Sequence, residues 1–333
     1  MTINSTKPDN SVIQWLLDSD PSIRWQALRD LQHASAAEVA AERARVATEG
    51  WGAALLAAQT EGGIWPGGNP RLPEYTSLRT LLLLRDMGLG PASEQAKTAV
   101  ARVRKNVQWL MNIPEEDLPK DEDISWWHKP FFEGEVEPCI NGRVVTIGAY
   151  FGEDVQPIVE RLLGEQMADG GWNCDQEQGS TRGSFHTTID VLEGLLEFER
   201  GTGGSPAVEA ARERGQEYLL ERRLFKRLST GVAIEQDRKD GPVWTQFSYP
   251  AGWRYDILRG LDYLRAAGVE PDPRMKEAIE IIASKRDASG RWALGIVHPE
   301  EVVAEPGVTE GQPSRWNTLR ALRVLDWYDT SST

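Results

Sequence analysis

The amino-acid sequence predicts an all-α protein. Apolar residues recur with helical spacing along most of the chain, and almost no stretch alternates polar and apolar residues as a half-buried strand does. Gly and Pro gather in short segments between these stretches, where they end helices. With 333 residues and a hydrophobic content of 40%, the chain is long enough to bury a sizeable core.

Start and stop signals divide the chain into successive helices. Asp20-Pro21 marks a helix start, Ser35 is a candidate N-cap, and Gly88-Leu89-Gly90-Pro91 separates two helices. Residues 113–138 form the longest irregular stretch, and their many aromatic residues indicate an ordered lid or pocket wall. Helices are expected over residues 11–32 with a break at Asp20-Pro21, 35–48, 51–59, 74–87, 93–111, 139–151, 155–166, 185–200, 207–222, 253–267, 273–285 and 314–327.

Charge and cysteine usage exclude several classes of function. A net charge of -14 and a pI near 4.9 argue against binding nucleic acid or an anionic membrane, because basic residues are not in excess. The polar residues 1–10 do not resemble a signal peptide, and no apolar run is long enough to span a bilayer, so a cytoplasmic protein is expected. In that compartment Cys139 and Cys174 are expected to be free thiols or metal ligands.

Two short patterns repeat along the chain. The pattern aromatic-x-x-Leu-Arg-x-Leu begins at Trp25, Tyr75, Tyr255 and Trp316, and its spacing places the apolar residues on one helix face. Its Arg is expected to pair with neighbouring acids or loop carbonyls. The pattern Gln-x-x-x-Gly-x-Trp begins at Gln59 and Gln166, and Arg286 begins a third copy with Arg in place of Gln. Two interleaved repeats predict stacked helix pairs.

These repeats resemble the QW motifs of the squalene and oxidosqualene cyclase and protein prenyltransferase β-subunit superfamily. The resemblance implies an α/α toroid of alternating inner and outer helices over residues 51–328, in which the N-terminal ends of the inner helices surround a central cavity. Residues 11–50 look like a HEAT-like helical segment that packs on the toroid. Residues 1–10 are expected to be disordered, and residues 329–333 form a tail.

A candidate zinc site lies near the expected starts of two inner helices. Cys139 and His186 begin these helices and Cys174 precedes the second, and zinc prefers thiolate and imidazole ligands. The segments Glu137-x-Cys139 and Phe185-His186-Thr187 are similar to the zinc-binding segments of prenyltransferase β-subunits. That resemblance implies Glu137, Cys139 and His186 as ligands, with Cys174 as an added or replacement ligand. Asp175 and His128 are further candidates. The same residues are equally typical of a small core thiol or a capping histidine.

Other side chains are expected at the same rim. Tyr255 and Asp256 are candidate catalytic residues, although Asp256 is equally explained as a helix cap. Aromatic and polar residues that would form the wall of a pocket for an apolar substrate are Trp126, Trp127, Phe131, Trp253, Arg254, Trp316 and Asn317.

The resemblance implies a zinc-dependent transferase, cyclase or lyase that acts on a small, largely apolar, isoprenoid-like substrate. The basic cluster that holds diphosphate in the prenyltransferases and the Asp-x-Asp-Asp motif of the cyclases are both missing from the sequence. Two other hypotheses stay open: a non-catalytic helical-repeat protein that binds a lipid or peptide, and a metal-free lyase-type enzyme that uses Tyr255 and Asp256. The oligomeric state and the need for a partner subunit do not follow from the sequence.

Overall fold

The computed structural model describes residues 9–66, 73–110, 128–234 and 243–330. The chain divides into two compact units, each made of separate chain segments. Unit 1 comprises Met1–Ala54, Asp86–Gly90 and Gln216–Thr333, and unit 2 comprises Leu55–Arg85 and Pro91–Gly215. Residues 11–50, which the sequence sets apart as an N-terminal segment, therefore belong to the same unit as the C-terminal helices.

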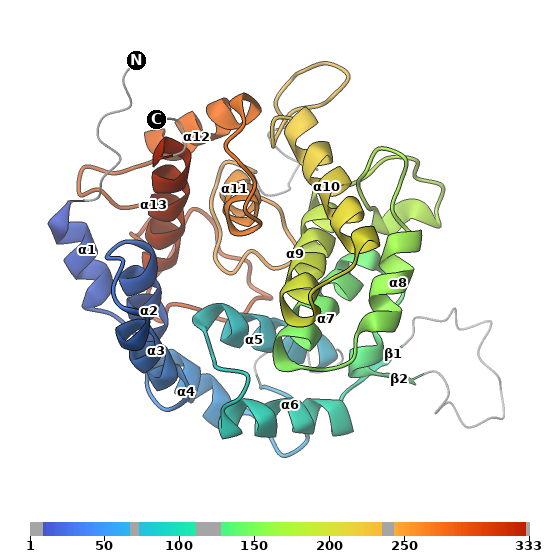
Figure 1. Ribbon diagram of the computed structural model, residues 1–333. Helices are drawn as coiled ribbons and strands as arrows, with labels where there is room; N and C mark the ends of the chain where they lie inside the picture. The colour runs from blue at the N-terminus through green and yellow to red at the C-terminus, as the bar shows by residue number, and fades with distance from the viewer. Residues whose placement is uncertain (1–8, 67–72, 111–127, 235–242, 331–333) are drawn as a thin grey trace. The chain divides into compact units, whose positions relative to one another are not determined.

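The described part of the chain is mostly helical, which confirms the all-α prediction (Figure 1). The α-helices are α1 (Asn10–Leu17), α2 (Pro21–Asp30), α3 (Ala36–Ala44), α4 (Gly50–Ala58), α5 (Pro73–Met87), α6 (Glu94–Asn106), α7 (Pro138–Phe151), α8 (Gln156–Gly164), α9 (Phe185–Thr202), α10 (Pro206–Glu221), α11 (Ile257–Ala266), α12 (Lys276–Ser284) and α13 (Arg315–Thr330). The short 3-10 helices are η1 (Arg45–Ala47), η4 (Phe131–Glu133), η5 (Cys174–Gln176) and η6 (Pro273–Met275).

Polar caps fix the starts of several helices where the sequence predicts them. Asp20 accepts a hydrogen bond from the backbone N–H of Ser22 at 2.9 Å, and Pro21 occupies the first helical position of α2. Ser35 caps α3 in a capping box, because its hydroxyl accepts from the N–H of Glu38 while the Glu38 carboxylate accepts from the Ser35 N–H. The N-cap predicted at Ser35 is thus confirmed.

Within unit 2, α7 and α9 lie side by side and run in the same direction (Figure 1). A Cβ atom added to Gly142 would lie 2.5 Å from the carbonyl oxygen of Asp190, so the two backbones approach too closely for a side chain at this position. Further along, a Cβ on Gly201 would lie 3.2 Å from the carbonyl oxygen of Ala149. The N-terminal ends of both helices therefore lie at the same end of the unit.

The Gln-x-x-x-Gly-x-Trp motif at Gln166 is a turn that ties three helices together. The Gln166 amide donates to the carbonyl oxygens of Gly170 and Ala211, each at 2.8 Å. The indole N–H of Trp172 donates to the carbonyl oxygen of Leu162 at 2.7 Å. Gly170 has a φ of +85°, which favours glycine. The motif thus joins the end of α8 to α10 and leads the chain to α9.

The motif at Gln59 repeats this geometry. The Gln59 amide donates to the carbonyl oxygens of Gly63 at 3.2 Å and Ala99 at 3.0 Å. The indole N–H of Trp65 donates to the carbonyl oxygen of Leu55 at 2.7 Å. The two complete copies of the motif are therefore structurally equivalent, as their spacing predicts.

The degenerate third copy keeps the tryptophan but changes the partner of the glycine. The indole N–H of Trp292 donates to the carbonyl oxygen of Ile282 at 2.8 Å, and the Arg286 guanidinium lies over the Trp292 ring. A Cβ on Gly290 would lie 2.9 Å from the side chain of Val12, on α1. Within unit 1, the first helix of the chain therefore packs against the last of the three turns.

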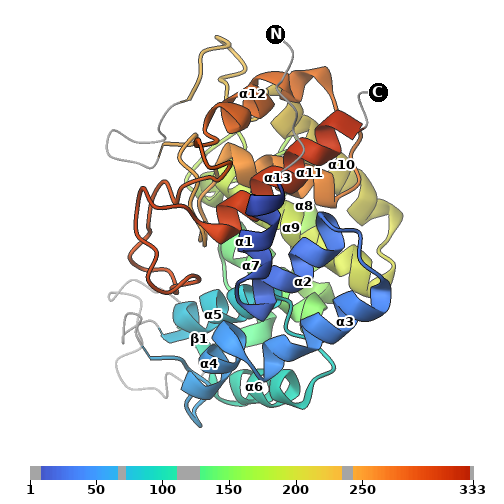
Figure 2. The same ribbon diagram turned by 90° about the vertical axis from the view of Figure 1, so that its left-hand side faces the viewer.

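In unit 1, α2 lies beside α13, the last helix of the chain (Figure 2). A charge network joins these two helices to α11. Arg323 on α13 forms an ion pair with Asp262 on α11, and its guanidinium lies 3.6 Å from the Asp30 carboxylate on α2. Two copies of the repeated Arg have the structural role that the sequence predicts. Arg259 donates to the carbonyl oxygens of Gly252 and Arg254, and Arg320 donates to the carbonyl oxygen of Ser248 at 3.3 Å.

The structure corrects two helix boundaries. The stretch 93–111 was expected to stay helical, but α6 ends at Asn106 and the chain continues as β1 (Gln108–Leu110), which pairs antiparallel with β2 (His128–Pro130). The stretch 253–267 was expected to be helical from Trp253, but α11 begins at Ile257 because Asp256 is its N-cap. No helix of the described residues is long and apolar enough to cross a bilayer.

Candidate metal centre

Cys139 lies in the first turn of α7, and two side chains fix that turn. The Asn141 side chain accepts from the backbone N–H of Glu135 at 2.7 Å and donates to the carbonyl oxygen of Glu135 at 2.9 Å. The Glu135 carboxylate accepts from the N–H groups of Val136 and Glu137 at 2.6 and 2.7 Å. The N–H groups of the three residues before α7 are thus hydrogen-bonded to nearby side chains, which fixes the approach of the chain to the turn that presents Cys139.

Cys174 lies in η5, inside the loop between α8 and α9. Asn173 closes this loop, because its side chain accepts from the N–H of Asp175 and donates to the Ser180 hydroxyl and the Arg182 carbonyl oxygen. The backbone N–H of Ser184 donates to the carbonyl oxygen of Trp172 at 2.8 Å, which holds the two ends of the loop together.

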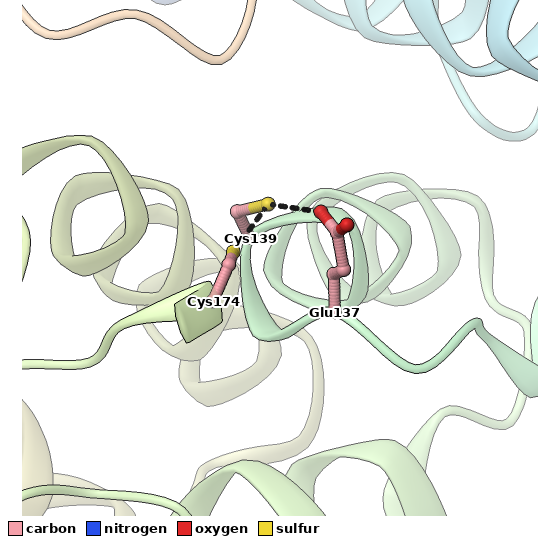
Figure 3. A group of neighbouring side chains, drawn as sticks. All are labelled: Glu137, Cys139 and Cys174. Carbon is pink, nitrogen blue, oxygen red and sulfur yellow. Dashed lines mark hydrogen bonds between the residues drawn. The ribbon is translucent and has the colours of Figure 1, made fainter. Parts of the chain in front are cut away.

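Three metal-ligand side chains converge between these two elements (Figure 3). One donor atom from each of Glu137, Cys139 and Cys174 lies within 4.8 Å of the other two. The two Sγ atoms are 2.9 Å apart, and the Cys139 Sγ lies 3.5 Å from the Glu137 Oε2. The hydroxyl of Thr187, on α9, lies 3.4 Å from the Cys174 Sγ.

The environment of the cluster is acidic. Burial, followed by the charge of Glu135, raises the pKa of Glu74 above its usual range. Burial also raises the pKa of Tyr75, and the carboxylates of Glu135 and Glu137 raise it further. Glu137 lies 3.5 Å from the Cys139 sulfur, so its negative charge favours a bound cation at the cluster.

The pKa of the Cys139 thiol is also well above its ordinary value. The largest cause is the hydrogen bond with Cys174, followed by burial and by the nearby charges of Cys174, Asp190 and Glu137. Asp190 is itself fully buried and forms a 3.0 Å ion pair with Arg143, one turn after Cys139 on α7. A cation at the cluster would offset the charge of the deprotonated sulfur atoms.

His186 is placed on α9 as expected, but it does not belong to the group of three converging donors. The next residue, Thr187, contacts the Cys174 sulfur instead. Asp175 is exposed on η5, and His128 is in β2, where it pairs with Leu110. Among the described residues, the structure thus brings together Glu137, Cys139 and Cys174 of the predicted ligands.

The donor set fits zinc in chemistry and approximately in spacing. Zinc favours thiolate with imidazole or carboxylate ligands, and a tetrahedral zinc separates neighbouring sulfur and oxygen ligands by about 3.5 Å. The 3.5 Å between Cys139 Sγ and Glu137 Oε2 matches that value. The 2.9 Å between the two sulfur atoms is shorter than the roughly 3.7 Å that such a site needs, so the sulfur atoms would have to separate slightly.

Comparison with protein-family models and with curated proteins finds no match to this chain. The chemistry of the site is therefore inferred from its own residues and their geometry.

The candidate catalytic residues Tyr255 and Asp256 belong to unit 1. Asp256 caps α11, because its carboxylate accepts from the N–H of Arg259 at 2.8 Å, and burial raises its pKa. Tyr255 is buried, and its ring centroid lies 5.3 Å from that of Trp244. Both side chains have structural roles in α11 and its packing.

The expected pocket residues have varied environments. Phe131 is fully buried and stacks on Trp109 at 5.1 Å, and Trp316 is buried and stacks on Tyr249 at 4.4 Å. The amide of the buried Asn317 donates to two backbone carbonyl oxygens. These three side chains are therefore packed in the interior.

Trp253 and Arg254 are partly exposed. The Arg254 guanidinium lies over the Trp253 ring and forms an ion pair with Glu300. Trp126 and Trp127 lie outside the described residues.

Proposed function

We propose that this protein is a zinc-dependent enzyme of the α/α toroid class, in which Glu137, Cys139 and Cys174 hold the metal. The observation that carries the proposal is the convergence of two thiols and a carboxylate from two separate elements. Catalytic zinc sites hold the metal with three protein ligands and leave a fourth position open, and this cluster supplies three. Both cysteines are partly exposed and Glu137 is exposed, which allows a substrate to approach.

The repeats support the toroid part of the proposal. The Gln59 and Gln166 motifs form the same turn, each tying the end of one helix to a later helix. In unit 2 the two helices nearest the site, α7 and α9, run in parallel, as the inner helices of a toroid do. This similarity to the squalene cyclase and prenyltransferase superfamily supports the fold, while the reaction is argued from the site.

A small, largely apolar substrate fits the surroundings of the cluster better than a diphosphate does. Glu137 lies 3.5 Å from the Cys139 sulfur, the charges of Glu137 and Asp190 act on this thiol, and Arg143 pairs with Asp190. A diphosphate would be repelled by these carboxylates. When bound, zinc would polarise a carbonyl group or lower the pKa of a bound water or thiol. Because thiol ligands must stay reduced, we place the enzyme in the cytoplasm.

Metal analysis of purified protein tests the proposal. The wild type, treated with chelator and reloaded with zinc, is expected to retain about one zinc per chain after gel filtration, as measured by plasma mass spectrometry. Cys139→Ser and Cys174→Ser should lose it, and Glu137→Gln should retain less. Asp175→Asn is the matched control, because this exposed carboxylate lies beside Cys174 but outside the cluster.

Two outcomes would decide against the proposed site. Wild-type protein that retains no zinc after reloading would overturn the metal centre and favour a non-catalytic helical-repeat binding protein. Zinc that persists in both cysteine variants would place the metal elsewhere. His186→Ala is included because loss of zinc in this variant would identify the imidazole as a fourth ligand that moves in on binding.

A further inference from the structure

The sulfur atoms of Cys139 and Cys174 lie closer together than the roughly 3.7 Å between two thiolate ligands of a tetrahedral zinc ion. They are 2.9 Å apart, and a disulfide bond requires about 2.05 Å. An approach of about 0.9 Å would therefore bring them to bonding distance. These are the two cysteines of the chain, so each thiol has one intramolecular partner.

The two thiols come from elements that differ in their exposure to solvent. Cys139 is fixed in α7, whose first turn is held by the Glu135–Asn141 hydrogen bonds and whose next turn packs closely on α9 at Gly142. Cys174 lies in a loop in which residues 175–179 are all exposed. A small oxidant can therefore approach the Cys174 side of the pair from solvent.

We propose that Cys139 and Cys174 are a reversible oxidation site that forms an intramolecular disulfide with a small-molecule disulfide as oxidant. The disulfide itself does not depend on a bound metal. Its consequence for the enzyme rests on the proposed function: a disulfide removes both thiolate ligands, so the metal site would exist in the dithiol state and be lost on oxidation.

The exchange with oxidised glutathione balances as follows. The thiolate of one cysteine attacks the glutathione disulfide, which breaks that bond, forms a mixed disulfide and releases one glutathione thiolate. The second cysteine thiolate attacks the mixed disulfide at the protein sulfur, forms the Cys139–Cys174 bond and releases the second glutathione. The two protons lost by the cysteines are taken up by the two glutathione thiolates. The protein loses two electrons and the glutathione disulfide gains them.

The test is a redox titration of the full-length, chelator-treated chain with mixtures of reduced and oxidised glutathione. It is run at about pH 8 so that a larger fraction of the thiols is ionised. At each ratio, free thiols are trapped by alkylation and the intact mass is measured. Wild-type protein is expected to lose both free thiols together and the mass of two hydrogen atoms, and dithiothreitol should reverse both changes. Peptide mapping without reductant should recover the two cysteine peptides linked.

Cys139→Ser and Cys174→Ser are matched controls. Each lacks the resolving thiol, so each should accumulate a glutathione adduct that the wild type does not accumulate. A stable adduct on the wild type, disulfide-linked dimers, or a disulfide that forms no more readily in the folded chain than in the chain unfolded by guanidinium would overturn the proposal.

A second arm separates this proposal from the metal proposal. Zinc-loaded wild type should oxidise more slowly than the zinc-free protein and should release zinc to a chromogenic chelator as the thiols disappear. If the disulfide forms but zinc never binds, the oxidation site stands and the proposed function fails. If zinc binds and no intramolecular disulfide forms under any ratio, the metal centre stands and the oxidation site fails.

Discussion

Gly194 on α9 lies against the carbonyl oxygen of Gly142 on α7, so closely that a Cβ on Gly194 would overlap it. Gly142 is one turn after Cys139, and Gly194 follows Thr187 on the helix that contacts Cys174. The same close approach thus joins the helix that presents Cys139 to the helix whose Thr187 contacts Cys174.

Replacing this glycine should destabilise the protein. The Cβ of Gly194→Ala would meet backbone rather than a flexible side chain, so we expect the free energy of unfolding to fall by about 1–3 kcal/mol. Gly164→Ala is the control, because Gly164 ends α8 and has no atom within 4 Å of its added Cβ. Urea unfolding followed by circular dichroism measures both. Equal stability of the two variants would contradict the close packing of α7 and α9.

The turn at Gln166 provides a second stability test. Gln166→Ala would leave the carbonyl oxygens of Gly170 and Ala211 without their side-chain donor, and a loss of about 1–3 kcal/mol is expected. Gln178→Ala, an exposed glutamine on the following loop, should change the free energy of unfolding by less than about 0.5 kcal/mol. If Gln166→Ala unfolds at the same urea concentration as Gln178→Ala, the motif does not hold α8 to α10.

The helices and the turns could be predicted because their signals are local. Gln166, Gly170 and Trp172 act through short-range hydrogen bonds and a positive φ, and Ser35 caps the helix that follows it directly. Asp256 was considered as a helix cap, and the structure confirms that role. The start of α11 was nevertheless placed at Trp253, because Trp253 continues the helical spacing of the apolar residues on the other side of the cap.

Only part of the candidate site could be predicted, because its residues come from separate elements. Cys139 and Cys174 were expected at one rim, and the structure brings them together. α9 begins at Phe185 as predicted, but neighbouring residues of a helix are rotated by about 100° from each other, and which of them faces the cysteines depends on how the helix packs. That rotation directs Thr187 to the Cys174 sulfur, and the resemblance had pointed to His186. The buried carboxylates of Glu74 and Glu135 carry no local sequence signal that distinguishes them from exposed acids.

The charge network around Asp262 predicts a pH-dependent stability. Burial alone would raise the pKa of the Asp262 carboxyl, but the charges of Arg323, Arg265 and Arg320 outweigh burial and hold it well below its usual range. Because the folded pKa lies below the unfolded value of about 3.9, the stabilisation is fully present above that value and is lost as pH falls.

Asp262→Asn should therefore lower the free energy of unfolding by about 1–3 kcal/mol near pH 7, since it removes the shared carboxylate and leaves Asp30 as the charged partner of the Arg323 guanidinium. The difference between wild type and variant should shrink as the pH falls from about 5 towards 3. Urea unfolding at several pH values measures the difference. A difference that stays constant over this range would show that Asp262 does not stabilise the fold through its charge.

The contact between Thr187 and Cys174 leads to a prediction about metal affinity. The Thr187 hydroxyl lies 3.4 Å from the Cys174 sulfur, and the side chain is buried, so it orients the thiol without belonging to the group of three donors. Thr187→Val keeps the shape of the side chain and removes the hydroxyl. If zinc binds as proposed, we expect the affinity to fall about tenfold, the lower end of the range for residues that orient a ligand. Competition with a chromogenic chelator measures the affinity, with Thr181→Val as the control because Thr181 is exposed in the same loop. An unchanged affinity in Thr187→Val would mean that the Cys174 sulfur reaches the metal without help from α9.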